Sequence, residues 1–354
     1  MQKKSLNEFN AELQANINNG EFEESISILS IAITQYPNEN KLKLNLGNVY
    51  KVLGQIDNAI NVYTTLLSTS LKNIANNNLS AIMLETGQIE KCINHARSAL
   101  EDNENYYDAK YNLALGLFEN KNYSESLNIC NDLLIEENYR DRAYELKIRI
   151  EQIICKWDHF YETQELLKNN EIIVHPFLHV SYVSDESSNC RNAKSWNKDV
   201  LSTKINKQLI KTDNKIRLGF LCGEIRNHPT YYLIKNLFKN INKDTFSMYM
   251  FSYDHEIGKK LHIEQDFNEF IDITPLNAAE SKDKIEDYDL DILIDLTTII
   301  SHNRSNIIHQ DIAKIIIAYL AFPGTTGSHV YDYILTDNIV TVSYTHLRAH
   351  ETRI

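Results

Sequence analysis

Residues 215–230 read Lys215-Ile-Arg-Leu-Gly-Phe-Leu-Cys-Gly-Glu-Ile-Arg-Asn-His228-Pro-Thr230. The apolar run Ile216–Leu221 predicts a buried strand, and the amphipathic segment Thr230–Ile241 predicts a helix that follows the loop. In an open α/β sheet, ligands bind at the carboxyl ends of the strands. His228 therefore stands where a side chain can meet a ligand, and an imidazole can accept a proton near neutral pH.

Apolar runs alternate with amphipathic helices through the rest of this region. The runs are Phe246–Phe251, Asp291–Leu296, Lys314–Tyr319 and Tyr333–Leu335, and the helical segments are Ile257–Phe267, Ala278–Tyr288 and Arg304–His309. This alternation predicts a mostly parallel sheet that is covered on both faces, an α/β Rossmann-like lobe. Gly219 and Gly223 do not form the G-x-G-x-x-G fingerprint, so we expect neither NAD nor FAD.

Glycines recur at a nearly constant interval in the first part of the chain. Gly20, Gly54 and Gly87 are 34 and 33 residues apart, and Lys121 continues the register after another 34. The best copy runs from Asn40 to Asn73 and carries, at tetratricopeptide spacing, Leu46, Gly47, Tyr50, Gly54, Ala59, Tyr63 and Leu66. A single helix pair cannot bury its apolar face, so such copies stack into a solenoid.

These patterns divide the chain into four parts. We predict a tetratricopeptide repeat array over residues 1–140, a helical linker region over 141–214, the α/β lobe over 215–340 and a short tail over 341–354. The concave surface of a solenoid generally holds protein segments, whereas a spacer or a dimer contact is the alternative. His175, which precedes Pro176 in the linker region, fits a capping or packing role better than a site.

Composition limits the classes of function. The formal charge of −12 over 354 residues argues against a nucleic-acid binder, which needs a basic face. No segment is apolar enough to span a membrane, and the first residues lack the apolar core of a signal peptide. The five cysteines form no CxxC pair, so we expect no zinc site and a reducing, cytoplasmic location.

Several short motifs occur in a fixed order behind the repeats. They are Cys155-Lys-Trp157-Asp; Arg217-Leu-Gly219 with Asn227-His228-Pro229; Asp291-Ile-Leu-Ile-Asp295-Leu296; Pro323-Gly-Thr-Thr-Gly327; and Asp332-Tyr333 with Thr336-Asp337. In these motifs the chain resembles the O-linked N-acetylglucosamine transferases and SPINDLY-like proteins, over nearly all of residues 6–340. In that family tetratricopeptide repeats precede a glycosyltransferase of the two-lobed GT-B fold.

The resemblance implies an inverting, metal-independent glycosyltransferase that moves a sugar from a nucleotide sugar to serine or threonine of proteins. UDP-N-acetylglucosamine is the expected donor, although SPINDLY-like relatives leave a GDP-sugar open, and a glycan or asparagine acceptor also stays open. A tetratricopeptide adaptor without catalytic activity is the alternative from a different class. Nucleotide binding by the complete protein would favour the transferase, and partner capture by residues 1–140 without nucleotide binding would favour the adaptor.

Within this resemblance His228 is the expected proton acceptor, unless its ring only caps or packs the loop. The predicted substrate-binding residues are Asn227, Pro229, Thr230, Asp295, Pro323, Gly324, Thr325, Thr326 and Gly327. Thr230, Asp295 and residues 323–327 each have an alternative role that is only structural. Thr230 can simply cap a helix, Asp295 can satisfy backbone amides, and residues 323–327 can form an ordinary turn.

The chain also departs from the family pattern. Thr298-Ile299-Ile300 stands where relatives usually carry Gly-His-Thr, with His302 close by, and Ala321-Phe322 replaces the usual Gly-Tyr. These changes put acceptor and sugar preference, or activity itself, in question. The stretch from about residue 341 shifts toward arginine and histidine and resembles translated sequencing-adapter read-through. Because the family continues into a second lobe that holds the donor, we expect this polypeptide to bind no nucleotide sugar and to be inactive.

Overall fold

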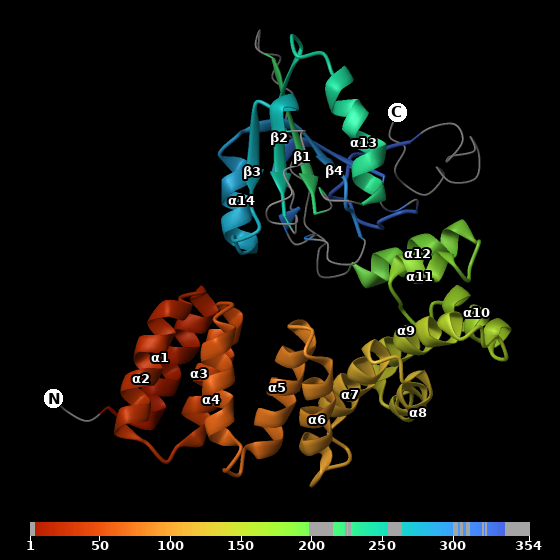
Figure 1. Cartoon of the computed structure of the whole chain (residues 1–354). Coiled ribbons are helices and arrows are strands. Elements are labelled where there is room, and N and C mark those ends of the chain that lie inside the picture. The colour runs from red at the N-terminus through yellow and green to blue at the C-terminus, as the bar shows by residue number, and fades with distance from the viewer. Residues whose placement is uncertain are drawn as a thin grey trace. The chain divides into compact units, whose positions relative to one another are not determined.

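The computed structural model describes residues 4–197, 215–223, 225, 228–253, 264–299, 304, 307–308, 312–320, 322 and 324–336. The chain forms two compact units, Met1–Trp157 and Asp158–Ile354. Figure 1 shows a row of helices in the first unit and a sheet with helices in the second. Within the described ranges, no helix is long and apolar enough to cross a membrane.

The first unit is a series of helices in which each one packs against the next along the chain. The helices are α1 (Leu6–Asn19), α2 (Phe22–Gln35), α3 (Asn40–Val52), α4 (Ile56–Leu66), α5 (Lys72–Glu85), α6 (Ile89–Leu100), α7 (Tyr107–Glu119), α8 (Tyr123–Leu133) and α9 (Glu137–Ile153). The predicted helical solenoid is therefore confirmed. Its unit continues beyond residue 140, because α9 packs on α7 and α8 and buries Ala143, Leu146 and Ile150.

The repeat register is visible in the backbone of the turns. Gly20, Gly54 and Gly87 have φ angles of 78°, 70° and 71°, and Lys121 has a φ of 61°. A left-handed residue after a helix turns its N–H back to the last turn, and the Lys121 N–H donates to the Phe118 carbonyl at 2.9 Å. Lys121 therefore occupies the same structural position as the three glycines, as the sequence spacing predicts.

In the second unit the described residues 158–197 form the helices α10 (Phe160–Lys168), α11 (Pro176–Val180) and α12 (Glu186–Trp196). His175 is the N-cap of α11, and its Nδ1 accepts a hydrogen bond from the Phe177 N–H at 3.2 Å. The capping role expected of His175 is therefore confirmed. Asp185 caps α12 in a similar way by accepting from the Ser188 N–H at 2.7 Å.

His179 lies at the centre of this helical group and is fully buried. Its Nδ1 is 2.7 Å from Asn189 Oδ1, and its Nε2 is 3.3 Å from the Leu167 carbonyl oxygen. Burial, the largest effect, lowers the pKa of the His179 ring, although the bonds to Asn189 and Leu167 oppose it. The folded state therefore favours the neutral ring.

This burial predicts a loss of stability on mild acidification. The folded pKa of His179 is depressed, so the unfolded chain takes up the proton first, and stability is lost as the pH falls through the ordinary value of about 6.5. We expect the free energy of unfolding to fall between about pH 7.5 and about pH 5.5, and His179→Gln to flatten that slope. Urea unfolding at several pH values measures both, and equal slopes in variant and wild type would contradict the prediction. His95 has a pKa lowered by burial too, but it is present in both proteins and cancels.

The sheet has six strands in the order β3-β2-β1-β4-β5-β6, and every recorded strand pair is parallel. The strands are β1 (Ile216–Cys222), β2 (Phe246–Ser252), β3 (Glu269–Asp272), β4 (Leu290–Asp295), β5 (Ala313–Tyr319) and β6 (Tyr333–Leu335). The predicted Rossmann-like lobe is confirmed, with β3 as a strand that the sequence did not predict. Of the expected helix Ile257–Phe267, only a 3₁₀ turn at Glu264–Asp266 lies within a described range.

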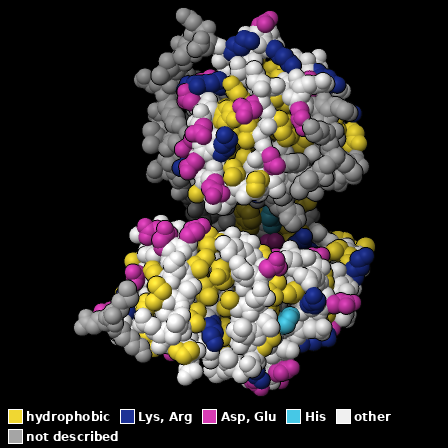
Figure 2. Space-filling model, turned by 60° about the vertical axis from the view of Figure 1, so that its left-hand side comes forward, with side chains coloured by type: hydrophobic (Ala, Val, Ile, Leu, Met, Phe, Trp, Pro, Cys, Tyr) yellow, Lys and Arg dark blue, Asp and Glu magenta, His cyan; other side chains and the backbone are white. Residues whose placement is uncertain are grey.

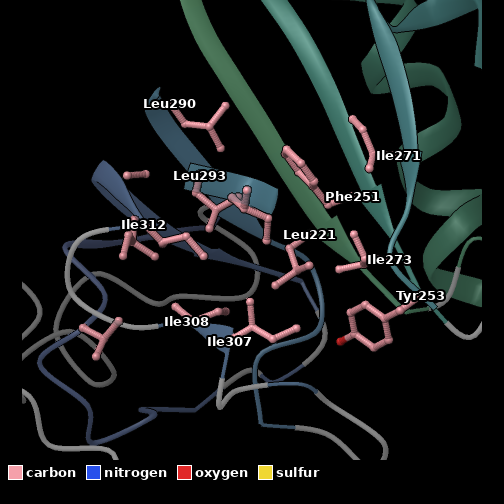
Figure 3. Packing of buried hydrophobic residues seen from close by; sticks show 14 residues of the cluster. Leu221, Phe251, Tyr253, Ile271, Ile273, Leu290, Leu293, Ile307, Ile308 and Ile312 are labelled. Carbon is pink, nitrogen blue, oxygen red and sulfur yellow. The ribbon is translucent and has the colours of Figure 1, made fainter. Parts of the chain in front are cut away.

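Two helices cover opposite faces of this sheet. Phe220 of β1 packs with Ile234 and Phe238 of α13 (Pro229–Asn240). The neighbouring Leu221 faces the other way and belongs to the cluster that contains Ile285 of α14 (Ala278–Glu286). Figure 3 shows this second cluster, in which Leu221, Leu290, Leu293 and Phe251 meet Ile307, Ile308 and Ile312. The alternation of side chains along β1 thus fixes which helix lies on which face.

Charged side chains are mixed by sign on the surface that Figure 2 displays. There, Lys and Arg side chains of the described residues lie among Asp and Glu side chains, next to hydrophobic and uncharged polar groups. This mixture accords with a chain of net charge −12, in which any anionic ligand needs a local site rather than a general basic face.

Candidate functional site

The strand order identifies one edge of the sheet as the place for a ligand. The chain turns from β1 to β2 on one side, and β4 lies on the other side of β1. In sheets of this order, the crevice outside the carboxyl ends at this switch point binds ligands. Leu221 of β1 is paired with Asp295 of β4, so the ends of the two strands lie side by side. His228 follows β1, and residues 324–327 follow β5 at the same edge.

His228 is the N-cap of α13, with Pro229 as the first helical residue. Its Nδ1 accepts a hydrogen bond from the Thr230 N–H at 3.3 Å and lies 3.2 Å from Thr230 Oγ1. The ring is partly exposed, whereas Thr230 is buried. The capping contact is therefore present, and the role of His228 as a proton acceptor stays a prediction. Asn227, the residue before it, lies outside the described residues.

Asp295 ends β4 as a fully enclosed carboxylate, with only 1% of its surface exposed. It accepts hydrogen bonds from the N–H groups of Thr297 and Thr298, at 2.9 and 3.0 Å, and from the Tyr331 hydroxyl at 2.7 Å. Burial raises the pKa of Asp295, while these bonds act in the opposite direction. The contacts fit the alternative in which Asp295 satisfies backbone amides and shapes the loop after β4.

Residues 324–327 form a tight loop held by its own hydroxyls. Thr325 Oγ1 accepts from the Gly327 N–H at 3.1 Å, and Thr326 Oγ1 accepts from the Ser328 N–H at 3.3 Å. The Asn197 side-chain amide donates to the Thr326 carbonyl, so α12 holds this loop from outside. Gly324 packs on Phe322, where a Cβ would lie 2.6 Å from the ring. Pro323 lies outside the described residues.

Gly327 lies directly against the backbone of α12. Its φ is 65°, and a Cβ placed on it would lie 2.4 Å from the Lys194 nitrogen and 2.6 Å from the Ala193 carbonyl carbon. The glycine does permit close backbone approach, as the sequence predicts. The approaching backbone is that of α12, however, and the role of the loop in substrate binding stays a prediction.

Comparison with known proteins shows which family the second unit resembles. Residues 195–350 match the model of Glycosyl transferase family 41, a range that contains the whole sheet. Over this range the chain is similar to that family. The matched range includes ten residues of the segment 341–354, for which the sequence predicts a foreign tail and which lies outside the described residues.

Two relatives and one solved structure illustrate the family 41 likeness. The chain is 26% identical over 136 residues to a probable UDP-N-acetylglucosamine–peptide N-acetylglucosaminyltransferase, SEC, of Arabidopsis thaliana, covering 38% of this chain and 14% of that protein. It is 21% identical over 133 residues to the UDP-N-acetylglucosamine–peptide N-acetylglucosaminyltransferase of Caenorhabditis elegans, covering 37% and 12%. A mutant O-GlcNAc transferase of Thermobaculum terrenum shares the fold, with a TM-score of 0.51 and 17% identity, over 83% of this chain and 53% of that one.

These alignments cover only part of the relatives. The matched regions are 14% and 12% of the two curated proteins, and the chain spans about half of the solved transferase, 53%. The family 41 likeness is shown for residues 195–350. The activity, substrates and partners of the whole protein are matters for proposal.

The loop after β4 carries backbone strain. Thr298, where the resemblance implies a glycine, has a φ of 46°. A β-branched residue in the left-handed region is strained by about 1–3 kcal/mol, which a glycine avoids. Its Oγ1 is buried and has no hydrogen-bond partner among the described residues. The two bonds from the Thr297 and Thr298 N–H groups to Asp295 hold this strained loop in place.

A network beside Asp295 was not foreseen from the sequence. The Tyr253 hydroxyl is 3.0 Å from Thr297 Oγ1, and it accepts from the Arg304 N–H at 3.3 Å. The Arg304 guanidinium lies 5.1 Å from the Tyr253 ring centroid and donates to the carbonyls of Ile273, Thr274 and Leu276. Burial raises the pKa of Tyr253, so it stays protonated and able to donate. The network connects the ends of β2, β3 and β4 around the site.

Among the described residues, no group of three or more His, Cys, Asp or Glu side chains could hold a metal ion. The polar groups at the carboxyl edge are instead an imidazole, hydroxyls and one carboxylate that is already occupied by three donors. Such groups can position a hydroxyl acceptor and take its proton.

Proposed function

We propose that this chain carries the repeat array and the first catalytic lobe of a protein O-glycosyltransferase. The reaction moves N-acetylglucosamine from UDP-N-acetylglucosamine to a serine or threonine hydroxyl with inversion. The observation that carries the proposal is the family 41 match over a six-stranded parallel sheet whose switch point presents His228. The names of the two curated relatives supply the donor and the peptide acceptor.

The chemistry asks three things of the protein. The acceptor hydroxyl must lose a proton, it must reach the anomeric carbon, and the leaving diphosphate must be stabilised. We assign the first task to His228, at the carboxyl edge of the sheet. The third task falls to the second lobe, where lysines and helix N-termini would balance the diphosphate charge.

The repeat unit supplies a surface for the acceptor protein. A groove between α1 and α3 is lined by the amides Asn10, Gln14, Asn45 and Asn48 and by the apolar side chains Leu13, Ile17, Phe22, Val49 and Val52. Amides can both donate to and accept from a peptide backbone. The lining carries no formal charge, so it suits an extended, uncharged segment with an aliphatic side chain. We propose that acceptor proteins bind here.

Val52 gives a test of this groove. Its side chain is 62% exposed, so Val52→Asp should leave the fold intact while placing a charge in an uncharged groove. We expect KM for a protein acceptor to rise about 10-fold in the complete transferase, which corresponds to about 1.4 kcal/mol of binding. KM for a short serine peptide, which cannot span both the repeats and the site, should not change. An equal rise in KM for both acceptors would show that the groove does not bind the acceptor protein.

The function itself is tested with radiolabelled donor. The complete transferase should transfer N-acetylglucosamine from UDP-N-acetylglucosamine to a serine-containing protein. Inhibition of this transfer by UDP but not by GDP would show that the donor is a UDP-sugar. If the complete protein binds neither nucleotide and residues 1–140 still capture protein segments, the adaptor function replaces the transferase. A cytoplasmic location is part of the proposal and agrees with the free cysteines, of which Cys92, Cys130, Cys190 and Cys222 are buried.

A further inference from the structure

We propose that Thr230 is a positioning residue that sets which nitrogen of His228 carries the proton. The inference rests on the proposed function, because it concerns how His228 becomes able to accept a proton from the acceptor hydroxyl. It is carried by two distances at the start of α13. His228 Nδ1 lies 3.3 Å from the Thr230 nitrogen and 3.2 Å from Thr230 Oγ1.

The two contacts differ in which tautomers they can serve, because the Thr230 N–H can only donate to Nδ1, whereas the Thr230 hydroxyl can donate to Nδ1 or accept from Nδ1–H. A neutral imidazole has one N–H and one lone pair. When Nδ1 accepts from the Thr230 N–H, the proton must sit on Nε2, and Nε2 can then donate but cannot accept. When Nδ1–H instead donates to Thr230 Oγ1, Nε2 carries the lone pair that a general base needs. The Thr230 hydroxyl is therefore the group that makes the basic tautomer accessible.

A second His-Pro motif in the same unit shows what happens without the hydroxyl. His175 precedes Pro176, caps α11 and accepts at Nδ1 from the Phe177 N–H at 3.2 Å. The residue two positions after this histidine is a phenylalanine, which offers no side-chain acceptor. Its cap thus favours the Nε2–H form alone. The two motifs share the cap and differ in the hydroxyl, so His175 serves as an internal reference.

The same hydroxyl matters more once the proton has been taken up. His228 then carries hydrogen on both nitrogens, and Nδ1–H needs an acceptor. The N-terminal end of α13 is the positive end of the helix dipole and disfavours a cation there. Thr230 is only 7% exposed, so bulk water reaches its surroundings poorly. Thr230 Oγ1, which lies 3.2 Å from His228 Nδ1, offsets both effects by accepting a hydrogen bond from Nδ1–H.

The tautomer can be measured directly in this chain, without any activity. Imidazole ¹⁵N shifts separate a protonated from an unprotonated nitrogen, and His228→Gln assigns the His228 signals among the twelve histidines. We expect wild-type His228 to show a population of the Nδ1–H form that His175 lacks. Thr230→Val, which keeps the branched shape and removes the hydroxyl, should convert His228 to the pattern of His175. Thr230→Ser should keep the wild-type pattern.

Turnover by the complete transferase provides a second test of the role of Thr230. Thr230→Val should lower kcat about 10- to 100-fold with little change in the KM for donor, and Thr230→Ser should restore most of the loss. A His228 spectrum that is the same in wild type and Thr230→Val overturns the inference. If the complete protein transfers no sugar at all, the proposed function fails, while the spectra still decide the role of Thr230.

Discussion

His228→Ala should abolish turnover by the complete transferase while leaving its affinity for UDP unchanged. A positioned general base contributes about 10²- to 10⁴-fold to a rate, and the imidazole is the group at the carboxyl edge of β1 that we assign to this task. In the proposed function the second lobe binds the diphosphate and the nucleoside, so their binding should not depend on the His228 side chain. Steady-state kinetics and calorimetric titration with UDP measure the two quantities separately.

The matched control for this variant is His175→Ala. Both substitutions remove a histidine N-cap that precedes proline, and each should cost about 1 kcal/mol of stability. Only the residue at the switch point should cost activity. Normal turnover in His228→Ala would show that His228 is not the proton acceptor. Equal losses in both variants would show that the effect comes from the cap and not from the chemistry.

Much of the second unit was predictable because its central strands are largely buried and appear as continuous apolar runs. The strands β1, β2, β4, β5 and the partly exposed β6 each begin and end within one residue of the predicted runs. The strand β3 was not predicted from the sequence, because Glu269 and Asp272 at its ends leave an apolar run of only two residues between them. The repeat register was predictable for a different reason, since left-handed turn residues recur at its period.

The site was predictable only where a local motif carries it. His228 and Pro229 are adjacent in sequence, so their cap geometry follows from the chain itself. The bond from Asn197 to Thr326 joins residues 129 apart, and no local pattern records such a pairing. For the same reason the Tyr253–Arg304 network and the bond from the Tyr331 hydroxyl to Asp295 became visible only in three dimensions. Hydrogen-bond partners across a fold depend on packing, which periodicity does not specify.

Gly327→Ala should destabilise the second unit by about 3 kcal/mol or more. The new Cβ would meet the backbone of Lys194 and Ala193 at 2.4 and 2.6 Å, and backbone in a helix cannot move aside as a flexible side chain can. The φ of 65° adds the cost of a left-handed residue, about 1 kcal/mol. Urea unfolding followed by the fluorescence of Trp196, on α12 itself, measures the loss in a Trp157→Phe background.

Gly20→Ala separates these two costs. Gly20 has a similar φ of 78°, but a Cβ there would meet no heavy atom within 4 Å, so only the backbone term of about 1 kcal/mol remains. The difference between the two variants is then the steric cost of α12 lying against the loop. If both lose the same stability, α12 does not press on Gly327 in solution. The glycine would then be free to admit a ligand, as the sequence first predicts, and the loop of residues 323–327 would return as a substrate contact.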